Sequence, residues 1–188
     1  AVDVRERGGK GIQTDISIRG GSFDQTMVTL NGINFTDART GHQSHSLPID
    51  INAVSSINVI DGVSGVGAYA GAVDIRTAPL YPRYVSVEAT GGAYGYYYGS
   101  LAGGYTTDRL SLLVTGSARH SGGYTHNTDF MNYNGYARLS YSSPRAGLFD
   151  MQVGYQNRAF GANGFYSLSY PDQFEQTSTA LASLRWLR

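Results

Sequence analysis

The 188 residues include 14 Lys or Arg and 14 Asp or Glu, and this zero formal charge argues against nucleic-acid binding, which generally needs a basic excess. The chain has no cysteine, which excludes disulfides and thiolate metal sites. Charged residues are 15% of the chain, whereas 25 residues are Gly and 15 are Tyr, a composition unusual for a cytosolic domain or a disordered segment. No apolar run approaches the roughly 18 residues of a membrane-spanning helix, but alternating membrane strands fit the composition.

The chain opens with two short segments of different pattern. Residues 1–13 are polar and rich in glycine, and they predict a loop. Neither a signal peptide nor an initiator Met precedes them, so we expect a mature or trimmed protein. Residues 15–19 then alternate, with Ile16 and Ile18 on one face, and predict a strand that ends at two consecutive glycines.

The strongest local signal is the dipeptide Asn31-Gly32, a preferred type I′ turn between the runs M-V-T-L and I-N-F. A two-residue loop at this position pairs Leu30 with Ile33. In this register, one face of the hairpin carries the apolar side chains of Val28, Leu30, Ile33 and Phe35. Turn chemistry and hydrophobic pattern therefore agree in predicting a β-hairpin.

The segments that follow are predicted from their turn and strand residues. They are an exposed loop at 36–46, a short helical turn from Leu47-Pro48 to about Ala53, a strand at 56–60, a glycine-rich return at 62–71, a strand at 72–77 and a boundary at 78–82. The glycines at 65–70 formally fit a dinucleotide-binding fingerprint. That motif needs a helix next, and because a strand follows at once, a tight return is the better interpretation.

Beyond the boundary the sequence changes to about six alternating strands of roughly ten residues. Their connections are short at 106–109 and 142–147 but long at 120–132 and 158–175. This asymmetry, with tyrosines near strand ends, is typical of outer-membrane β-barrels, and because about eight strands is the usual minimum we expect a C-terminally incomplete barrel. The two folds differ in where they place the side chains of Leu112, Val114, Leu139, Val153 and Leu184. In a barrel these side chains face lipid, whereas in a soluble β-sandwich they are buried in the core.

Four segments carry a resemblance to a known family. They are D-I-S-I-R-G-G (15–21), V-T-L-N-G-I-N (28–34), L-P-I-D-I-N-A-V-S-S-I-N-V-I-D-G (47–62) and A-G-A-V-D-I-R-T (70–77). In this order they resemble the plug of TonB-dependent outer-membrane receptors. Residues 61–63 read D-G-V where the family usually has R-G-P, and the return to Ala70 is shorter than usual, so we expect a piece of loop to be missing near Gly65.

The resemblance implies an all-β-dominated fold with a small α/β plug. Residues 1–80 are expected to form an N-terminally incomplete plug domain. Residues 81–188 are expected to form the first antiparallel strands of a transmembrane β-barrel, which in such transporters has about 22 strands.

The resemblance also implies a function. A receptor of this family lies in the outer membrane of a Gram-negative bacterium, in contact with its lipid, and imports a scarce nutrient. A TonB-type energy-transducing protein supplies the work, and the segment that contacts it is not in this chain. Candidate ligands are cobalamin, a siderophore, haem or an oligosaccharide, and a surface lipoprotein is a further partner that the family allows. No cofactor or nucleic acid is expected.

Two segments suggest a finer assignment. Residues 40–49 and 160–176 look most like receptors of the Bacteroidetes group, which are often grouped with vitamin B12 receptors. The alternative function is an extracellular β-rich binding or adhesin module without transport.

No Ser-His-Asp ordering, nucleophile elbow or P-loop is recognisable, so we expect no enzyme and no catalytic residues.

Two sets of residues are candidates for ligand binding, because loops on rigid scaffolds commonly carry recognition. The apical plug loop offers Asp37, Arg39, Thr40, His42, Gln43 and Ser44. The long connections offer Tyr124, His126, Phe160, Asn163, Phe165 and Tyr166. A merely solvated loop in the first case, and aromatic side chains packed on one another in the second, are equally good explanations.

Two further features have competing explanations. His42 and His45 could bind a metal with Asp37, but solvated loop histidines are the better explanation because supporting ligands are few. Arg19 is expected to form an ion pair between plug and barrel rather than to contact ligand.

Overall fold

The computed structural model describes residues 2–7, 13–35, 47–62, 69–165, 167 and 169–188. Its first elements are β1 (Val2–Arg7), β2 (Gln13–Ile18), the 3₁₀ helix η1 (Phe23–Gln25), β3 (Thr26–Leu30), β4 (Ile33–Asn34), the 3₁₀ helix η2 (Ile51–Ala53), β5 (Val54–Asp61) and β6 (Gly71–Thr77). The strands that follow are β7 (Arg83–Gly91), β8 (Tyr97–Thr106), β9 (Leu110–Ser121), β10 (Phe130–Ser143), β11 (Gly147–Gly161) and β12 (Phe174–Leu187). In the described part of the chain, no helix is long and apolar enough to cross a membrane.

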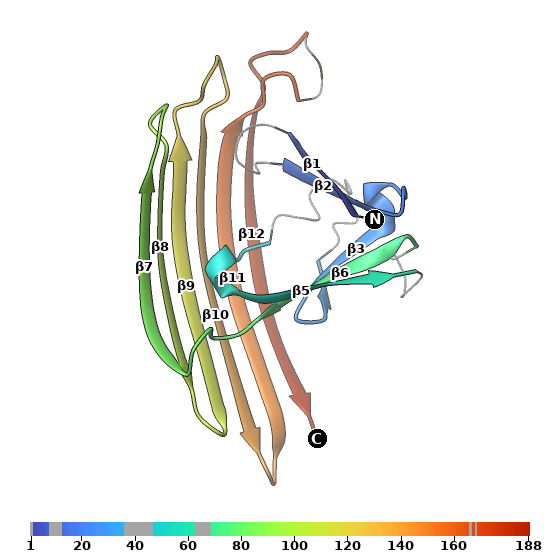
Figure 1. Ribbon diagram of the computed structural model, residues 1–188, viewed down its shortest axis with the longest axis vertical. Helices are drawn as coiled ribbons and strands as arrows, with labels where there is room; N and C mark the ends of the chain where they lie inside the picture. Colours follow the sequence, from blue (N-terminus) through green and yellow to red (C-terminus); the bar gives the residue numbers. More distant parts are fainter. Residues whose placement is uncertain (1, 8–12, 36–46, 63–68, 166, 168) are drawn as a thin grey trace.

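The strands form three sheets. They are a β1–β2 pair, a four-stranded sheet in the order β4-β3-β6-β5, and a six-stranded antiparallel sheet in sequence order from β7 to β12. We call the first two sheets the plug and the six-stranded sheet the wall. The wall is tall and curved, and the plug lies against one of its faces (Figure 1). The predicted fold class, a small domain followed by about six antiparallel strands, is confirmed.

Residues 2–7, predicted to be a loop, form strand β1. This strand pairs antiparallel with β2, beginning with Val2 opposite Ile18. The prediction was wrong because a polar, glycine-rich segment carries little strand signal of its own, whereas the edge of β2 offers hydrogen-bond partners to its backbone.

The predicted helical turn is shorter than expected. Only residues Ile51–Ala53 form it, and Asp50 rather than Pro48 marks its start. The Asp50 carboxylate accepts a hydrogen bond from the backbone N–H of Asn52 at 3.0 Å, which is the usual role of an N-cap residue. The strand predicted at 56–60 is correspondingly longer, because its pairing with β6 extends from Val54 to Asp61.

The predicted hairpin is confirmed. β3 pairs with β4 with Leu30 opposite Ile33. Asn31 and Gly32 have φ angles of 52° and 81°, the left-handed conformation that both central residues of a type I′ turn adopt. Because β3 also pairs in parallel with β6, this turn projects from the centre of the plug sheet.

The apolar core lies inside the plug and between the plug and the wall. Val28 and Val73 are buried together between plug strands. A second cluster joins Leu30 of the plug to Leu113 and Tyr136 of the wall. Removing these side chains from water is the main non-directional contribution to holding the plug on the wall.

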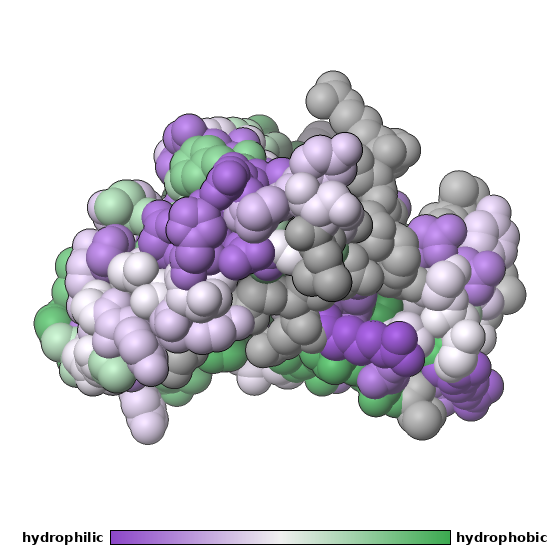
Figure 2. Space-filling model, turned by 90° about the horizontal axis from the view of Figure 1, so that it is seen from above, coloured by the Kyte–Doolittle hydropathy of each residue, from purple (hydrophilic) through white to green (hydrophobic). Residues whose placement is uncertain are grey.

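Side chains of the wall alternate between two faces, as predicted. On β11, Asp150 and Gln152 are buried toward the plug, whereas Met151 and Val153 are exposed on the outer face. The outer face also carries Leu184, which is 73% exposed. No described sheet covers this apolar face, in contrast to a β-sandwich. Seen from the loop end, hydrophilic residues gather over the top while hydrophobic residues border part of the outline (Figure 2).

The asymmetry of the connections is also confirmed, although the long ones are shorter than predicted. Strands β9 and β11 continue to Ser121 and Gly161. The long connections therefore span only residues 122–129 and 162–173, and both lie at the same end of the wall (Figure 1).

Asp74 is a buried carboxylate in the middle of the plug sheet. It accepts hydrogen bonds from the Thr29 hydroxyl at 2.6 Å and from Arg76 Nε. Burial is the largest influence on its pKa and raises it, but the hydrogen bonds from Thr29 and Arg76 and the charge of Arg76 together leave the pKa below its ordinary value. The ionised form therefore stabilises the folded plug.

We expect the contribution of Asp74 to depend on pH. A carboxyl group whose pKa is lowered on folding stabilises the protein above its unfolded pKa of about 3.9, and this stabilisation is lost as the pH falls through the lower folded value. Asp74→Asn should therefore lower the urea midpoint of plug unfolding at pH 6 and approach the wild type at pH 3, measured by circular dichroism. A difference that is the same at both pH values would contradict this role.

Gly71 is expected to be indispensable at the start of β6. Its φ is +148°, and a Cβ there would lie 2.6 Å from the backbone oxygen of Ile60. Gly71→Ala should therefore cost about 1–3 kcal/mol of plug stability, measured by urea unfolding. Gly135→Ala in β10 is the matched control, since a Cβ there meets no atom within 4 Å. Equal midpoints for the two variants would show that the site tolerates a side chain.

Candidate functional site

The inward face of the wall is polar where the plug meets it. Directly paired residues of neighbouring strands lie side by side, so inward side chains form transverse rows. One row sets Arg138 opposite Gln152, and the next sets Ser140 opposite Asp150. The plug hairpin turn meets the wall at these rows.

The side chain of Asn31 in the hairpin turn is the centre of this contact, and the residue is only 1% exposed. Its amide nitrogen lies within hydrogen-bond distance of three acceptors, which are Thr77 Oγ1 at 2.9 Å, Tyr136 Oη at 3.1 Å and Gln152 Oε1 at 2.8 Å. Its amide oxygen accepts from the Thr77 backbone N–H and from Arg138 Nη1, both at 2.9 Å. One plug side chain thus satisfies polar groups of two wall strands.

A buried carboxylate of the wall continues this network. Asp150 accepts from Arg138 Nε at 2.9 Å, from Ser140 Oγ at 2.6 Å and from Arg185 Nη2 at 3.0 Å. It therefore joins strands β10, β11 and β12 beneath the hairpin turn. A buried charge is tolerated only when it is paired and hydrogen-bonded in this way. The Asp150 carboxylate fixes Arg138, and Arg138 in turn contacts Asn31 of the plug.

Helix η2 makes a second polar contact with the wall. Asp50, the residue that caps it, accepts a hydrogen bond from Tyr98 Oη on β8 at 2.9 Å. Asn52 donates to Ser100 Oγ, also on β8, at 2.9 Å. The plug is therefore attached at two separated places, one on β8 and one on β10–β12.

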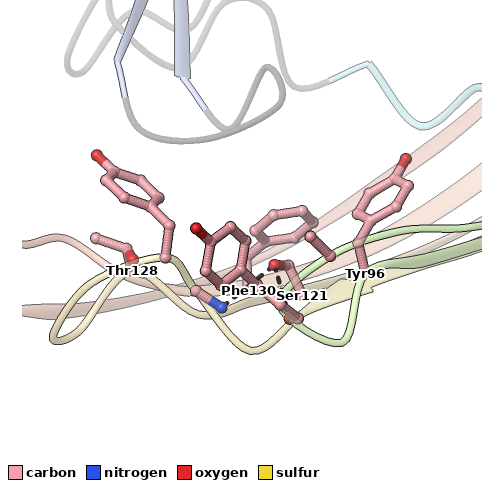
Figure 3. A pocket seen from close by; sticks show the side chains of 8 residues that line it. Tyr96, Ser121, Thr128 and Phe130 are labelled. Atoms are coloured by element: carbon pink, nitrogen blue, oxygen red, sulfur yellow. Dashed lines mark hydrogen bonds between the residues drawn. The ribbon is translucent and has the colours of Figure 1, made fainter.

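An aromatic hollow of about 310 Å³ opens at the loop end of the wall. Its lining comes from the β7–β8 and β9–β10 connections and the adjoining strand ends, and consists of Ala93, Tyr94, Tyr96, Ser121, Gly123, Tyr124, Thr128 and Phe130. Figure 3 shows Thr128 and Tyr96 at its two ends, with Phe130 and Ser121 between them. A mostly apolar hollow with a few polar groups is the usual character of a small-molecule site.

The structure brings several of the predicted loop residues together. Tyr124 lines the hollow. His126 and Asn163 link the two long connections, because His126 Nε2 lies 2.6 Å from Asp172 Oδ1 and Asn163 Nδ2 donates to the His126 backbone oxygen at 2.8 Å. The two connections therefore hold one another in place beside the hollow.

The predicted aromatic residues of the β11–β12 connection are packed. Phe160 lies in β11 and is 1% exposed, in a cluster with Phe130 and Ala162. Its ring centroid is 5.5 Å from that of Phe165. Phe160 thus supports the hollow from behind, since Phe130 belongs to both the cluster and the lining.

The other candidates lie outside the described residues. They are Asp37, Arg39, Thr40, His42, Gln43, Ser44, His45 and Tyr166, and the same is true of Gly65. Across the described residues, no group of three or more His, Asp or Glu side chains could hold a metal ion.

The prediction for Arg19 was wrong. Its guanidinium pairs with the carboxylate of Asp61 at 2.9 Å, and both side chains are exposed. Arg19 directly follows β2 and Asp61 ends β5, so the pair joins two segments of the plug rather than plug and wall.

The residues of the plug–wall contact were not among the sequence-derived candidates. Arg138 and Asp150 do carry a signal, because each is a charged residue at an inward position of an alternating strand. Such charges are costly near a membrane unless they are paired. Asn31 was not singled out as a contact residue, because the preference of Asn-Gly for a type I′ turn already explained an Asn at this position. Its contact with the wall therefore had no separate signal in the sequence.

Comparison with known proteins agrees with this geometry. The chain is similar in fold to the solved structure titled "Copper transporter OprC", with a TM-score of 0.71 and 18% identity over 97% of this chain and 29% of that one. It is also similar to the pyoverdine outer membrane receptor FpvA from Pseudomonas aeruginosa PAO1, with a TM-score of 0.67 and 15% identity over 85% of this chain and 24% of that one. No curated protein sequence matches the chain.

A plug docked on the polar inner face of an antiparallel wall is the arrangement that the chain shares in fold with these solved structures. Residues 1–74 match the family model described as "TonB-dependent Receptor Plug Domain". This match covers the plug strands up to Asp74 in β6 and does not extend to the wall. The chain spans less than a third of the length of the two solved structures named above.

We expect loss of the Asn31 side chain to loosen the plug. Asn31→Gly keeps a residue suited to the left-handed turn but removes the hydrogen bonds of the amide and leaves the Thr77 backbone N–H without its acceptor, at a cost of roughly 1–3 kcal/mol. The full-length protein in a planar bilayer should then become conductive at a lower urea concentration than wild type. Asn58→Ala, on exposed strand β5, is the control and should behave as wild type. Unchanged conductance in Asn31→Gly would show that the contact does not hold the plug.

Proposed function

We propose that the protein is an outer-membrane transporter that binds a nutrient at the loop end of its barrel and imports it when the plug moves. The observation that carries this proposal is the Asn31–Arg138 contact, which holds the plug across the inner face of the wall. A ligand bound at the loop end is separated from the other end by this contact. Passage therefore requires the contact to break, and no covalent chemistry is needed.

The ligand site that we propose combines the aromatic hollow with the sequence-derived candidates around it. Tyr124 lines the hollow, while His126, Asn163 and Asp172 tie the adjoining connections together. Asp37, Arg39, Thr40, His42, Gln43 and Ser44 of the apical plug loop are proposed to meet the ligand from the plug side. Tyrosines with scattered amides suit a ligand that is partly apolar and partly polar.

The ligand is proposed to be a scarce nutrient. The names of similar structures mention copper, pyoverdine and ferric yersiniabactin. The resemblance of residues 40–49 and 160–176 to Bacteroidetes receptors adds cobalamin, and haem and oligosaccharides complete the set to be tested. A surface lipoprotein is a further proposed partner.

Energy is proposed to come from a TonB-type protein of the inner membrane, which pulls on a plug segment that it binds by strand addition. The plug suits this role because polar contacts with the wall can be exchanged for contacts with water when it is pulled. A binding or adhesin module without transport would not require the plug to move.

A reversible crosslink between plug and wall tests the proposal. Asn52 and Ser100 are in direct hydrogen-bond contact at 2.9 Å, and the chain has no native cysteine. Asn52→Cys with Ser100→Cys, once oxidised, should reduce uptake of a bound nutrient at least tenfold while leaving surface binding intact, and a reductant should restore uptake. Ligands from the set above are screened for uptake by cells that express the full-length protein.

The matched control crosslinks the wall to itself. Asn134 Nδ2 donates to Ser117 Oγ at 2.9 Å on neighbouring strands β10 and β9. Ser117→Cys with Asn134→Cys should form a disulfide without affecting uptake. Full uptake through the oxidised plug–wall crosslink, or binding of ligand with no uptake by the wild type, would favour the adhesin alternative.

A further inference from the structure

The wall carries two inward rows that follow one another at its loop end. The outer row contains Phe130, paired with Ser121 on β9 and with Phe160 on β11. It contributes two residues, Ser121 and Phe130, to the lining of the aromatic hollow. The inner row, two residues further along each strand, consists of Tyr98, Arg119, Asn132, Arg158 and Thr177.

The two arginines of the inner row lie against aromatic rings. The guanidinium carbon of Arg119 is 5.1 Å from the ring centroid of Tyr98, and that of Arg158 is 5.3 Å from the ring centroid of Phe160. Such contacts orient a guanidinium and partly desolvate it without neutralising its charge. The rings thus hold positive charge directly beside the hollow.

Arg119 and its neighbour Asn132 have unused hydrogen-bonding capacity. Among the described residues, Arg119 forms no ion pair, and its buried Nε has no hydrogen-bond partner. The buried Oδ1 of Asn132, directly opposite Arg119 in the register, also has no partner among those residues. A buried donor and a buried acceptor without partners destabilise the site, and a ligand that supplies the missing hydrogen bonds removes this cost.

The nearby carboxylates have other contacts. Glu175, opposite Phe160 in the outer row, accepts from the Thr177 hydroxyl at 3.4 Å. Asp50 accepts from Tyr98 Oη and from the backbone of Asn52. Glu88, paired with Ser100 one row further along, lies 3.5 Å from the Asn52 amide. Among the described residues, none of these carboxylates forms an ion pair with Arg119, which lies one row from the hollow lining at Ser121.

We infer that Arg119 and Asn132 form the polar end of the ligand site and select an anionic ligand. Arg119 donates to a carboxylate or comparable oxyanion, Asn132 Oδ1 accepts from a hydroxyl or N–H group beside it, and the aromatic hollow receives the apolar body. This inference rests on the proposed function, whose ligand site it extends by one row toward the plug.

The test compares two probes that share a ring system and a hydroxyl group and carry either a carboxylate or its neutral amide. Fluorescence titration of the full-length protein in detergent measures binding of 3-hydroxy-2-naphthoate and of its neutral amide, 3-hydroxy-2-naphthamide. Wild type should bind the carboxylate about tenfold or more tightly than the amide, because a charge-assisted hydrogen bond is lost in the amide. Arg119→Gln should remove this preference, so that the two probes bind within about twofold of one another, while Arg119→Lys, which keeps the charge, should retain part of it.

Arg109→Gln is the control, since Arg109 lies in an exposed turn at the opposite end of the wall, and it should keep the full preference. Equal binding of the two probes by wild type, or a preference that survives Arg119→Gln, overturns the inference. Binding of neither probe also overturns it. None of these binding results decides whether the protein transports its ligand, because that is tested separately by the plug–wall crosslink. Failure of this inference can therefore be distinguished from failure of the transport proposal.

Discussion

Polar side chains on the inner face of a barrel wall must find hydrogen-bond partners, and in this protein Asn31 of the plug meets much of that requirement. Its amide contacts side chains from β10 and β11 and the end of its own sheet. Without it, the Thr77 backbone N–H would lose its acceptor, at a cost of about 1–3 kcal/mol. Tyr136, Gln152 and Arg138 would each lose one of their hydrogen bonds. Plug and wall are thus complementary in hydrogen bonding.

Asn31 both forms the hairpin turn and contacts the wall, and its backbone conformation allows both roles. The type I′ turn requires left-handed φ angles, which Asn adopts more readily than most residues. That conformation directs the amide from the end of the central plug strand onto the wall. Because this contact is polar, water can replace its hydrogen bonds when the plug is displaced, whereas the apolar cluster around Leu30 would lose its burial.

Along the inner face, three kinds of surface follow one another from the loop end. The aromatic hollow comes first, then the row with Arg119 and Asn132, and then the contacts of η2 and the hairpin turn with the wall. All three are carried by the same strands. A ligand in the hollow would therefore lie within two rows of the plug contact on β8, close enough for binding to influence the plug directly.

Much of the fold could be predicted because its signals are local. The Asn-Gly turn, the alternation of β11 around Val153 and the asymmetry of the connections each depend on residues near in sequence. Strand β1 was missed because its stability comes from β2, and η2 was placed too early because Pro48 was favoured over Asp50 as the first residue. Among the residues that line the hollow, the sequence identified Tyr124 as a candidate because it is an aromatic residue in a long connection. Tyr96 and Phe130 were not identified, since only the fold brings them close to Tyr124.

The sequence by itself determined which residues turn inward and outward on the wall, and where the plug hairpin bends, because both follow from a period of two and from turn geometry. Only the tertiary structure decided which polar groups pair. Asn31 and Arg138 are 107 positions apart, and Asn31 and Gln152 are 121 apart. Their contact depends on strand register and on how the plug docks, which are properties of the whole fold rather than of either segment.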